Sequence, residues 1–191
     1  MKAGRVVLVL GGARSGKSAF AQRLAGELGD GRAIFVATAQ ALDEEMAERI
    51  RRHRRDRPAD WPTVEAPRQV AERLAAVWRD ERAVLIDCLS LLVSNVILSL
   101  GEGAGLQGAE EAVERELDGL ETLFRSRPAS WVIVSNEVGL GVVPPYPAGR
   151  LFRDVLGRAN QRMAARADEV WLLVAGLPLR LKPGATGPSA G

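Results

Sequence analysis

The chain has 191 residues, of which 47% are hydrophobic and 26% are charged, and its formal net charge at pH 7 is +2. These values fit a globular protein with one core of ordinary size. No apolar run is long enough to span a membrane, and the first residues lack the pattern of a signal peptide. Cys88 is the only cysteine. An internal disulfide is therefore excluded, and we expect a protein of the reducing cytoplasm.

The first informative stretch combines a strand, a glycine turn and a helix. Residues 5–10 are apolar and rich in β-branched side chains, which predicts a buried strand, and residues 18–25 predict a helix. Between them, Gly11–Ser18 matches the pattern G-x-x-x-x-G-K-[ST] in the context that a phosphate loop requires. We expect Lys17 to reach the β- and γ-phosphates of a nucleoside triphosphate and Ser18 to help hold Mg²⁺. The alternative is a chance glycine turn.

A second strand is predicted over 32–38, and it ends in small residues. Open α/β sheets bind ligands at the carboxyl ends of their strands, so Thr38 either faces a ligand or is an ordinary turn residue. Residues 43–55 begin with acids and end with bases, which predicts an exposed helix with a thin apolar stripe. A short extended piece over 63–65 and an amphipathic helix over 68–78 follow.

The next predicted strand, residues 82–87, ends in an acid. In phosphate-loop proteins a carboxylate at such a position holds Mg²⁺ directly or through water, and we favour this role for Asp87 over a helix cap or a loop acid. Cys88 follows directly, and we expect it to be a small core residue and not a nucleophile.

The second half of the chain continues the alternation. Helices are predicted over 89–100, 109–125 and 151–167, and strands over 130–135 and 168–174. A flexible loop is expected over 101–108. Residues 138–147 form either a cover over the site or a structural connector. This pattern predicts an α/β fold, with a mostly parallel sheet flanked by helices, in a single nucleotide-binding domain over 1–182. We expect a disordered tail over 183–191.

The segment from Arg49 to Arg57 is crowded with arginine and contains His53, the only histidine. Three interpretations remain open from the residues alone. The segment is a solvated basic helix face, a nucleic-acid patch, or a triphosphate site with His53 as nucleophile. In the third case the arginines disfavour the imidazolium, which keeps the ring nucleophilic, and they stabilise charge on the attacked phosphate.

Several motifs together resemble one family, the bifunctional adenosylcobinamide kinase / adenosylcobinamide-phosphate guanylyltransferases of cobalamin biosynthesis. The resemblance extends to about Lys182. Besides the phosphate loop, it rests on Val36-Ala37-Thr38-Ala39, Asp43-Glu44-Glu45-Met46, His53-Arg54, Arg57-Pro58, Trp61, Ile86-Asp87-Cys88-Leu89, Ser135-Asn136-Glu137-Val138-Gly139, Phe152-Arg153-Asp154, Gly157 and Asn160-Gln161.

The resemblance implies a RecA-like phosphate-loop NTPase fold and a homotrimer. It also implies two reactions: phosphorylation of adenosylcobinamide by ATP or GTP, and transfer of GMP from GTP to the resulting phosphate through a GMP–histidine intermediate. His53 matches the guanylylated histidine, Lys17 is the second expected catalytic residue, and Ser18 with Asp87 would serve Mg²⁺. The implied nucleotide contacts are Gly11, Gly12, Ala13, Arg14, Ser15, Gly16, Lys17, Ser18, Ala37, Thr38, Ala39, Arg54, Arg55, Asp56, Arg57, Glu65 and Asp87.

Two departures from the family pattern stand near this site. Some relatives carry Glu in place of Asp87, which leaves direct or water-mediated contact with Mg²⁺ open. Some carry a second histidine where this chain has Arg52, so nothing here backs up His53. Two alternative functions stay open: a small-molecule phosphate-loop kinase without guanylyl transfer, and a nucleotide-dependent module that grips nucleic acid with the arginine-rich helix.

Overall fold

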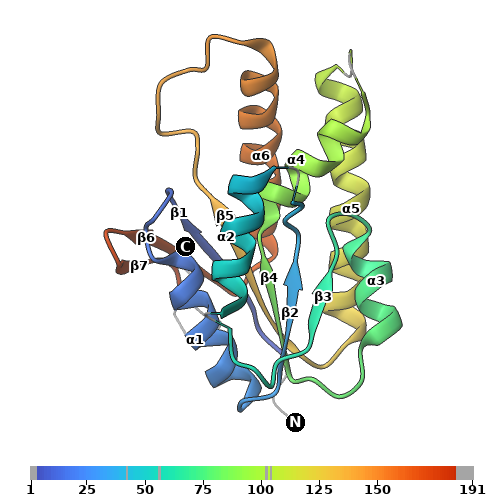
Figure 1. Ribbon diagram of the computed structural model, residues 1–191, viewed down its shortest axis with the longest axis vertical. Coiled ribbons are helices and arrows are strands. Elements are labelled where there is room, and N and C mark those ends of the chain that lie inside the picture. Colours follow the sequence, from blue (N-terminus) through green and yellow to red (C-terminus); the bar gives the residue numbers. More distant parts are fainter. Residues whose placement is uncertain (1–3, 42, 56, 102, 104, 184–191) are drawn as a thin grey trace, which may run out of the picture.

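The computed structural model describes residues 4–41, 43–55, 57–101, 103 and 105–183, with the backbone alone for residues 45, 49, 52 and 53. Within these residues the chain forms one seven-stranded sheet in the order β3-β2-β4-β5-β1-β6-β7 (Figure 1). All neighbouring strands pair in parallel except β6 and β7. The strands are β1 (Val6–Gly11), β2 (Ala33–Ala37), β3 (Thr63–Glu65), β4 (Ala83–Asp87), β5 (Ser130–Asn136), β6 (Glu169–Val174) and β7 (Leu177–Lys182).

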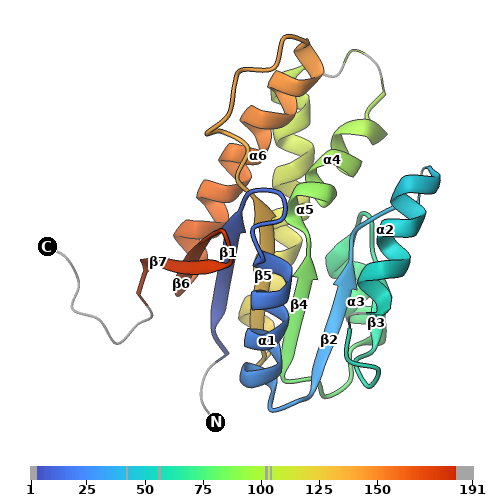
Figure 2. The ribbon, with the colours of Figure 1, turned by 60° about the vertical axis from the view of Figure 1, so that its left-hand side comes forward.

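Helices cover both faces of the sheet, which makes the molecule a three-layer α/β structure (Figure 2). One face is covered by α1 (Lys17–Gly29), and α2 (Glu44–Arg55) stands beside the carboxyl end of β2. The other face is covered by α3 (Val70–Val77), α4 (Leu89–Ser99), α5 (Leu106–Ser126) and α6 (Pro147–Arg166). Among the described helices, none combines the length and the apolar character that a membrane span requires.

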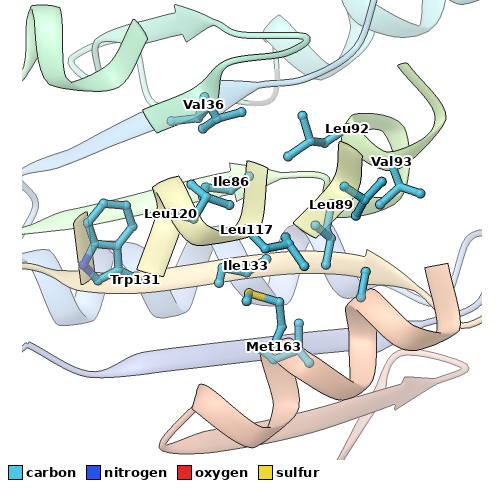
Figure 3. Close-up of a cluster of buried hydrophobic side chains, with 14 of the residues drawn as sticks. Val36, Ile86, Leu89, Leu92, Val93, Leu117, Leu120, Trp131, Ile133 and Met163 are labelled. Atoms are coloured by element: carbon cyan, nitrogen blue, oxygen red, sulfur yellow. The ribbon is translucent and has the colours of Figure 1, made fainter. Parts of the chain in front are cut away.

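The central strands are apolar over most of their length because both of their faces are buried. In β5, for example, Trp131 and Ile133 face the core under α3–α6, while Val132 and Val134 face the core under α1. Figure 3 shows the larger core, in which Leu117 and Leu120 of α5 lie over β4 and β5. The short apolar runs of the sequence therefore contribute to two cores, one on each face of the sheet.

The smaller core lets α1 approach the sheet closely. Ala21, Ala25 and Gly29 are the buried residues of α1, and the two alanines belong to the same core as Ala33 and Ala83 of the strands. A Cβ atom on Gly29 would lie 2.9 Å from the Cβ of Ala83, which is too close for any larger residue. This close packing seats the C-terminal end of α1 against the first residue of β4.

The predicted fold class is confirmed. The strand that leads into the phosphate loop, β1, and the strand that ends in Asp87, β4, are separated by β5, as expected for a RecA-like phosphate-loop fold.

The structure corrects the prediction at several element boundaries. Helix α5 begins at Leu106, inside the segment predicted as a loop, and α6 begins at Pro147, four residues before its predicted start. Proline is tolerated in the first turn of a helix because its missing N–H has no intrahelical partner there. The last predicted strand is followed by another, the antiparallel strand β7. Residues 184–191, where a disordered tail was predicted, lie outside the described residues.

Candidate active site

The phosphate loop links β1 to α1 through a sharp turn. Arg14 and Gly16 both have positive φ angles, of 56° and 89°, and Gly16 is the N-cap residue of α1. The N–H of Ser15 donates to the carbonyl of Gly12 at 3.3 Å. No described side chain caps α1, so the N–H groups of its first turn are left for an anion. The local geometry is therefore that of a phosphate-binding turn.

The β6–β7 hairpin supports this loop from the side. At the hairpin turn the N–H of Gly176 donates to the carbonyl of Ser15 at 2.9 Å. A Cβ atom on Gly16 would lie 3.3 Å from the Cα of Gly176, so the two backbones are almost in contact. On the other side, the N–H of Glu137 donates to the carbonyl of Gly11 at 3.2 Å. The loop is thus held in place by two neighbouring strands.

A cavity of about 500 Å³ opens at the end of the loop, above the carboxyl ends of β2, β4 and β5. It collects Lys17 and Ser18 from the loop and Asp87 from β4, and α2 supplies much of its opposite wall. The Lys17 ammonium donates to the carbonyl of Gly12 at 3.0 Å. The complete lining is Lys17, Ser18, Ala37, Ala39, Gln40, Ala41, Met46, Ala47, Ile50, Arg51, Arg54, Arg57, Glu65, Pro67, Asp87, Cys88, Leu91 and Asn136.

The structure brings together many of the residues predicted for the nucleotide site. Those that line the cavity are Lys17, Ser18, Ala37, Ala39, Arg54, Arg57, Glu65 and Asp87. Residues 11–16 form the loop that leads to it. Arg55 lies outside the lining, exposed and 3.5 Å from Glu48. Asp56 lies outside the described residues, and His53 is described by its backbone alone, in the last turn of α2 next to Arg54.

Thr38 stands apart from the other predicted contacts because its side chain is already engaged. The residue is fully buried, and its hydroxyl donates to the carbonyl of Cys88 and accepts from the N–H of Cys88, both at 2.8 Å. The carbonyl of Thr38 accepts from Nδ2 of Asn95 at 2.8 Å. The hydroxyl therefore ties the end of β2 to the end of β4, and Thr38 is not among the described residues that line the cavity.

The described arginines of α2 are paired with carboxylates. Arg51 contacts Glu48 at 2.8 Å and Glu44 at 3.2 Å, and hydrogen bonds to these two acids raise its pKa above the ordinary value. Arg54 forms an ion pair with Glu65 of β3. These pairs offset much of the positive charge, so the described part of the helix does not present the open basic face that phosphate backbones require.

Arg57 is the most unusual cation of the site. Its guanidinium lies over the ring of Phe35, 3.6 Å from the centroid, and its Nε is buried without a hydrogen-bond partner among the described residues. Burial lowers the pKa of Arg57, although the nearby charge of Asp87 opposes this shift. A partly desolvated guanidinium on an aromatic ring is a strong binding element for phosphate, because its charge is weakly screened.

The residues present fit a Mg²⁺ ion that is shared with a bound triphosphate. The described residues contain no cluster of three or more His, Cys, Asp or Glu side chains that would hold a metal alone. Mg²⁺, however, commonly takes only one or two protein oxygens and completes its shell with phosphates and water. The Ser18 hydroxyl and the Asp87 carboxylate, which line the same cavity, are oxygen donors of this kind.

Two neighbouring residues clarify the chemistry at Asp87. Burial raises the pKa of the Cys88 thiol, and the charge of Asp87 adds to this effect. The thiol is therefore protonated at neutral pH, as expected for a core residue and not a nucleophile. Asn136, at the end of β5, also lines the cavity and donates to the Ser90 hydroxyl at 3.0 Å. Asn136 is part of a motif that carries the family resemblance, but it was not predicted as a site residue.

The fold and the site together define a phosphate-loop protein that binds a nucleoside triphosphate, with a second acid strand and an arginine-bearing helix at the same cavity. Comparison with known proteins narrows this class. Residues 7–181 match the family model described as cobinamide kinase / cobinamide phosphate guanyltransferase. The chain belongs to this family.

Named relatives agree with the family match. The chain is 41% identical over 182 residues to the "Bifunctional adenosylcobalamin biosynthesis protein CobU" of Salmonella typhimurium, covering 93% of this chain and 99% of the relative. The protein of the same name from Escherichia coli is 40% identical, with the same coverage. "Bifunctional adenosylcobalamin biosynthesis protein CobP" of Pseudomonas aeruginosa is 44% identical over 176 residues, covering 92% and 96% of the two chains.

Among solved structures, the flagellar accessory protein FlaH from Methanocaldococcus jannaschii aligns with 15% identity and a TM-score of 0.48. The alignment covers 95% of this chain and 80% of that one. A likeness at this level carries no information about function.

Proposed function

We propose that this enzyme phosphorylates adenosylcobinamide with ATP or GTP and then transfers GMP from GTP to adenosylcobinamide phosphate, as its family membership implies. The observation that supports both activities is a single cavity that joins the phosphate loop, Asp87 and the helix that carries His53. Both reactions use a nucleoside triphosphate, so the same phosphate-binding residues can serve both of them.

In the kinase step the oxygen of the substrate hydroxyl attacks the γ-phosphorus. The new O–P bond forms as the bond between the γ-phosphorus and the bridging oxygen of the β-phosphate breaks, and the hydroxyl proton is released to solvent. Lys17 and the N–H groups at the start of α1 bind the phosphates and stabilise their negative charge. No covalent intermediate with the protein is needed, since the loop can position the γ-phosphate for direct attack.

In the guanylyl transfer step a neutral imidazole nitrogen of His53 attacks the α-phosphorus of GTP. An N–P bond forms, and the bond to the β-phosphate breaks, so that pyrophosphate leaves with the electron pair. The phosphate oxygen of the acceptor then attacks the same phosphorus, and the N–P bond breaks to return the histidine. Arg54 and Arg57, which line the cavity, stabilise the charge on the phosphates during both displacements.

Three further features belong to the proposal. Mg²⁺ would be held by Ser18 and Asp87, and when bound it neutralises part of the phosphate charge. The enzyme would act in the cytoplasm, in keeping with the single buried cysteine. It would assemble as a homotrimer, as the family resemblance implies.

Covalent labelling with GTP that carries a radioactive α-phosphate tests the proposal. We expect a label on the denatured protein that is stable in base and lost in acid, because phosphoramidates hydrolyse in acid. His53→Ala and His53→Asn should both abolish this label and GMP transfer, yet largely retain phosphorylation of cobinamide. The retained kinase activity serves as the control for folding in the same preparation.

Other outcomes would point to the alternatives. A protein that phosphorylates cobinamide but takes no label is a kinase without guanylyl transfer. A protein that does neither, but binds polynucleotides in a salt-sensitive manner, is the nucleic-acid module. A label that persists in either His53 variant would show that another residue is the nucleophile.

A further inference from the structure

A second cavity, of about 610 Å³, opens at the same catalytic centre. It shares Ser18, Arg57 and Asp87 with the cavity described above, but its remaining wall comes from α1, from β2 and from the segment that follows Arg57. Helix α2, which forms much of the first cavity, contributes nothing to the described lining of the second. Two separate chambers therefore meet at the residues that are proposed to hold Mg²⁺ and the phosphates.

The second cavity is apolar on its floor and cationic beside it. Phe35 and Trp61 are both buried and line it, and the indole N–H of Trp61 is already satisfied by the carbonyl of Gly31 at 3.1 Å. Arg23 and Arg57 line the same cavity, and Asp87 is the one acid in its described lining. An apolar surface with two arginines in its lining suits a ligand that is partly hydrophobic and carries an anionic group at one end.

We infer that this second cavity binds the acceptor substrate, with the aminopropanol arm of the corrinoid directed toward Ser18 and Asp87. The inference rests on the proposed function, because both reactions require an acceptor oxygen to reach phosphorus at this centre. We assign the first cavity to the nucleotide, because the end of the phosphate loop and the arginines of α2 line it. The second cavity approaches the same atoms from the α1 side, where an acceptor can enter without displacing the nucleotide.

The volume limits which part of the acceptor can enter. Cavities that enclose a drug-sized molecule span about 300–1,000 Å³. A corrinoid with its side-chain amides exceeds drug size, so a cavity of about 610 Å³ takes the arm and one edge of the ring, while the rest of the ring stays outside. The site therefore recognises the reactive end of the substrate.

The charges distinguish the two acceptors. In the kinase step the arm ends in a neutral hydroxyl, whereas in the transfer step it ends in a phosphate. Arg23 lines the second cavity but not the first. Its replacement should therefore weaken binding of an anionic acceptor more than binding of an alcohol. We expect Arg23→Ala to raise the KM for cobinamide phosphate by about threefold to tenfold and the KM for cobinamide by less than about twofold.

Gly26 offers the sharpest test, because it lines only the second cavity. It lies inside α1, and a Cβ atom there would be 3.5 Å from the indole of Trp61, an ordinary contact that a small side chain tolerates. Replacing a helical glycine also favours the helix. The series Gly26→Ala, Gly26→Leu and Gly26→Phe should therefore fill the cavity step by step in a folded protein. Gly108→Phe is the matched control, since Gly108 is an exposed glycine of α5 with no atom near its Cβ position.

Covalent labelling by GTP needs no acceptor. It therefore distinguishes a defect in the nucleotide cavity from a defect in the second cavity. We expect Gly26→Phe to raise the KM for the acceptor by about tenfold or more in both reactions, with GTP labelling within about twofold of the unmodified enzyme. Gly26→Ala should have a small effect, and Gly108→Phe none. Equilibrium dialysis with cobinamide, a coloured compound, should show the same order of affinities without any turnover.

Two results would overturn the inference. An unchanged acceptor KM and unchanged cobinamide binding in Gly26→Phe would show that the acceptor does not use this cavity. A loss of GTP labelling in step with the size of the side chain would assign the cavity to the nucleotide. If the unmodified enzyme shows neither labelling nor kinase activity, the proposed function fails, and dialysis with cobinamide still decides whether the cavity binds the corrinoid.

Discussion

Thr38 shows how strongly tertiary contacts can decide the role of a single polar residue. Its hydroxyl satisfies both the N–H and the carbonyl of Cys88, and all of these groups are buried. A buried donor left without a partner costs about 1–3 kcal/mol. We therefore expect Thr38→Val, a change of similar shape, to lower the free energy of unfolding by about this amount in urea denaturation.

Thr63 provides the control for this prediction, because it is an exposed threonine on β3. Thr63→Val should change the free energy of unfolding by less than about 0.5 kcal/mol. Equal stability of Thr38→Val and the unmodified protein would mean that the two buried hydrogen bonds contribute nothing. GTP labelling of Thr38→Val under stable conditions should remain, since the hydroxyl does not line the cavity.

Asp87 carries the metal part of the proposal. Its carboxylate lines the cavity together with the Ser18 hydroxyl, and an amide at the same position is a weaker ligand for Mg²⁺ because it lacks the charge. We expect Asp87→Asn to raise the Mg²⁺ concentration for half-maximal activity by about tenfold or more, with the far-ultraviolet spectrum unchanged. Asp80→Asn, which alters an exposed acid paired with Arg32, should leave that concentration as it is.

Single residues were predicted best where a motif imposes local geometry. Lys17, Ser18 and Asp87 were expected together, and they line one cavity. Met46, Leu91 and Asn136 also line the cavity but were not predicted as site residues, although Met46 and Asn136 lie within motifs that carry the family resemblance. The contact between Arg57 and Phe35 joins residues more than twenty positions apart. Such contacts depend on how strands and loops pack, which a motif does not encode.

At the scale of elements, Arg162 fastens α6 to α5. It contacts Glu121 at 2.7 Å and Asp118 at 2.6 Å and also pairs with Glu114, so one guanidinium meets three acids on successive turns of α5. Glu121 is almost completely buried, and it also contacts Arg166 at 3.1 Å. Arg125 also lies 3.7 Å from this carboxylate, so three arginines surround it. Removal of the arginines would leave an uncompensated buried charge, which is strongly destabilising.

This cluster makes the stability of the α5–α6 pair depend on pH. Burial by itself would raise the pKa of Glu121, but hydrogen bonds and charges from Arg162 and Arg166 outweigh it, and the pKa lies below its ordinary value. A depressed pKa in the folded state gives stability above the unfolded value, about pH 4.3 for glutamate, that is lost as pH falls through the folded value.

Glu121→Gln tests this linkage. The variant should lose about 1–3 kcal/mol of unfolding free energy at pH 7 and less at pH 3, because its side chain cannot be charged at either pH. Urea denaturation at the two pH values measures the difference. Glu111→Gln, which changes an exposed acid on α5, is the control and should show no such pH dependence. Equal losses at pH 7 and pH 3 would contradict the account.

The sequence predicted the elements that have strong apolar patterns, but it did not predict the exact residues at which several of them begin and end. The five inner strands are buried runs that any pattern analysis detects, whereas β7 consists of exposed residues and contains Pro178. Proline is tolerated there because β7 is an edge strand with one unpaired side. The signals that could have revealed it are the alternation of Leu177, Leu179 and Leu181 with other residues and the turn at Ala175 and Gly176, where both φ angles are positive.

At the scale of the whole molecule, the sheet brings every part of the candidate site to one edge. The phosphate loop follows β1, Ala37 and Ala39 lie at or beyond the end of β2, Asp87 ends β4, and Asn136 ends β5. Parallel strands place their carboxyl ends on the same side, so the alternation of strands and helices already predicted where a ligand would bind. The division of that edge into two cavities depends on α1 and α2 and was not predicted.

The last prediction concerns assembly. Several large apolar side chains are exposed on the single chain, and those of the hairpin gather on neighbouring positions of β6 and β7: Val174, Leu177, Leu179 and Leu181. Exposed apolar groups of this extent are typical of surfaces that meet another protein, because water contact with them is unfavourable. They favour association of the chain over a monomer, which is what the proposed homotrimer requires.

Light scattering and sedimentation equilibrium should give three times the 20.5 kDa mass of one chain at working concentrations. Hydrophobic contacts are weakly screened by salt, so the mass should not change between low and high ionic strength. If subunits complete one another's sites, the specific activity should also fall when dilution dissociates the trimer, and it should recover on concentration. A monomer with full specific activity at working concentration would contradict both the trimer and any sharing of the active site between subunits.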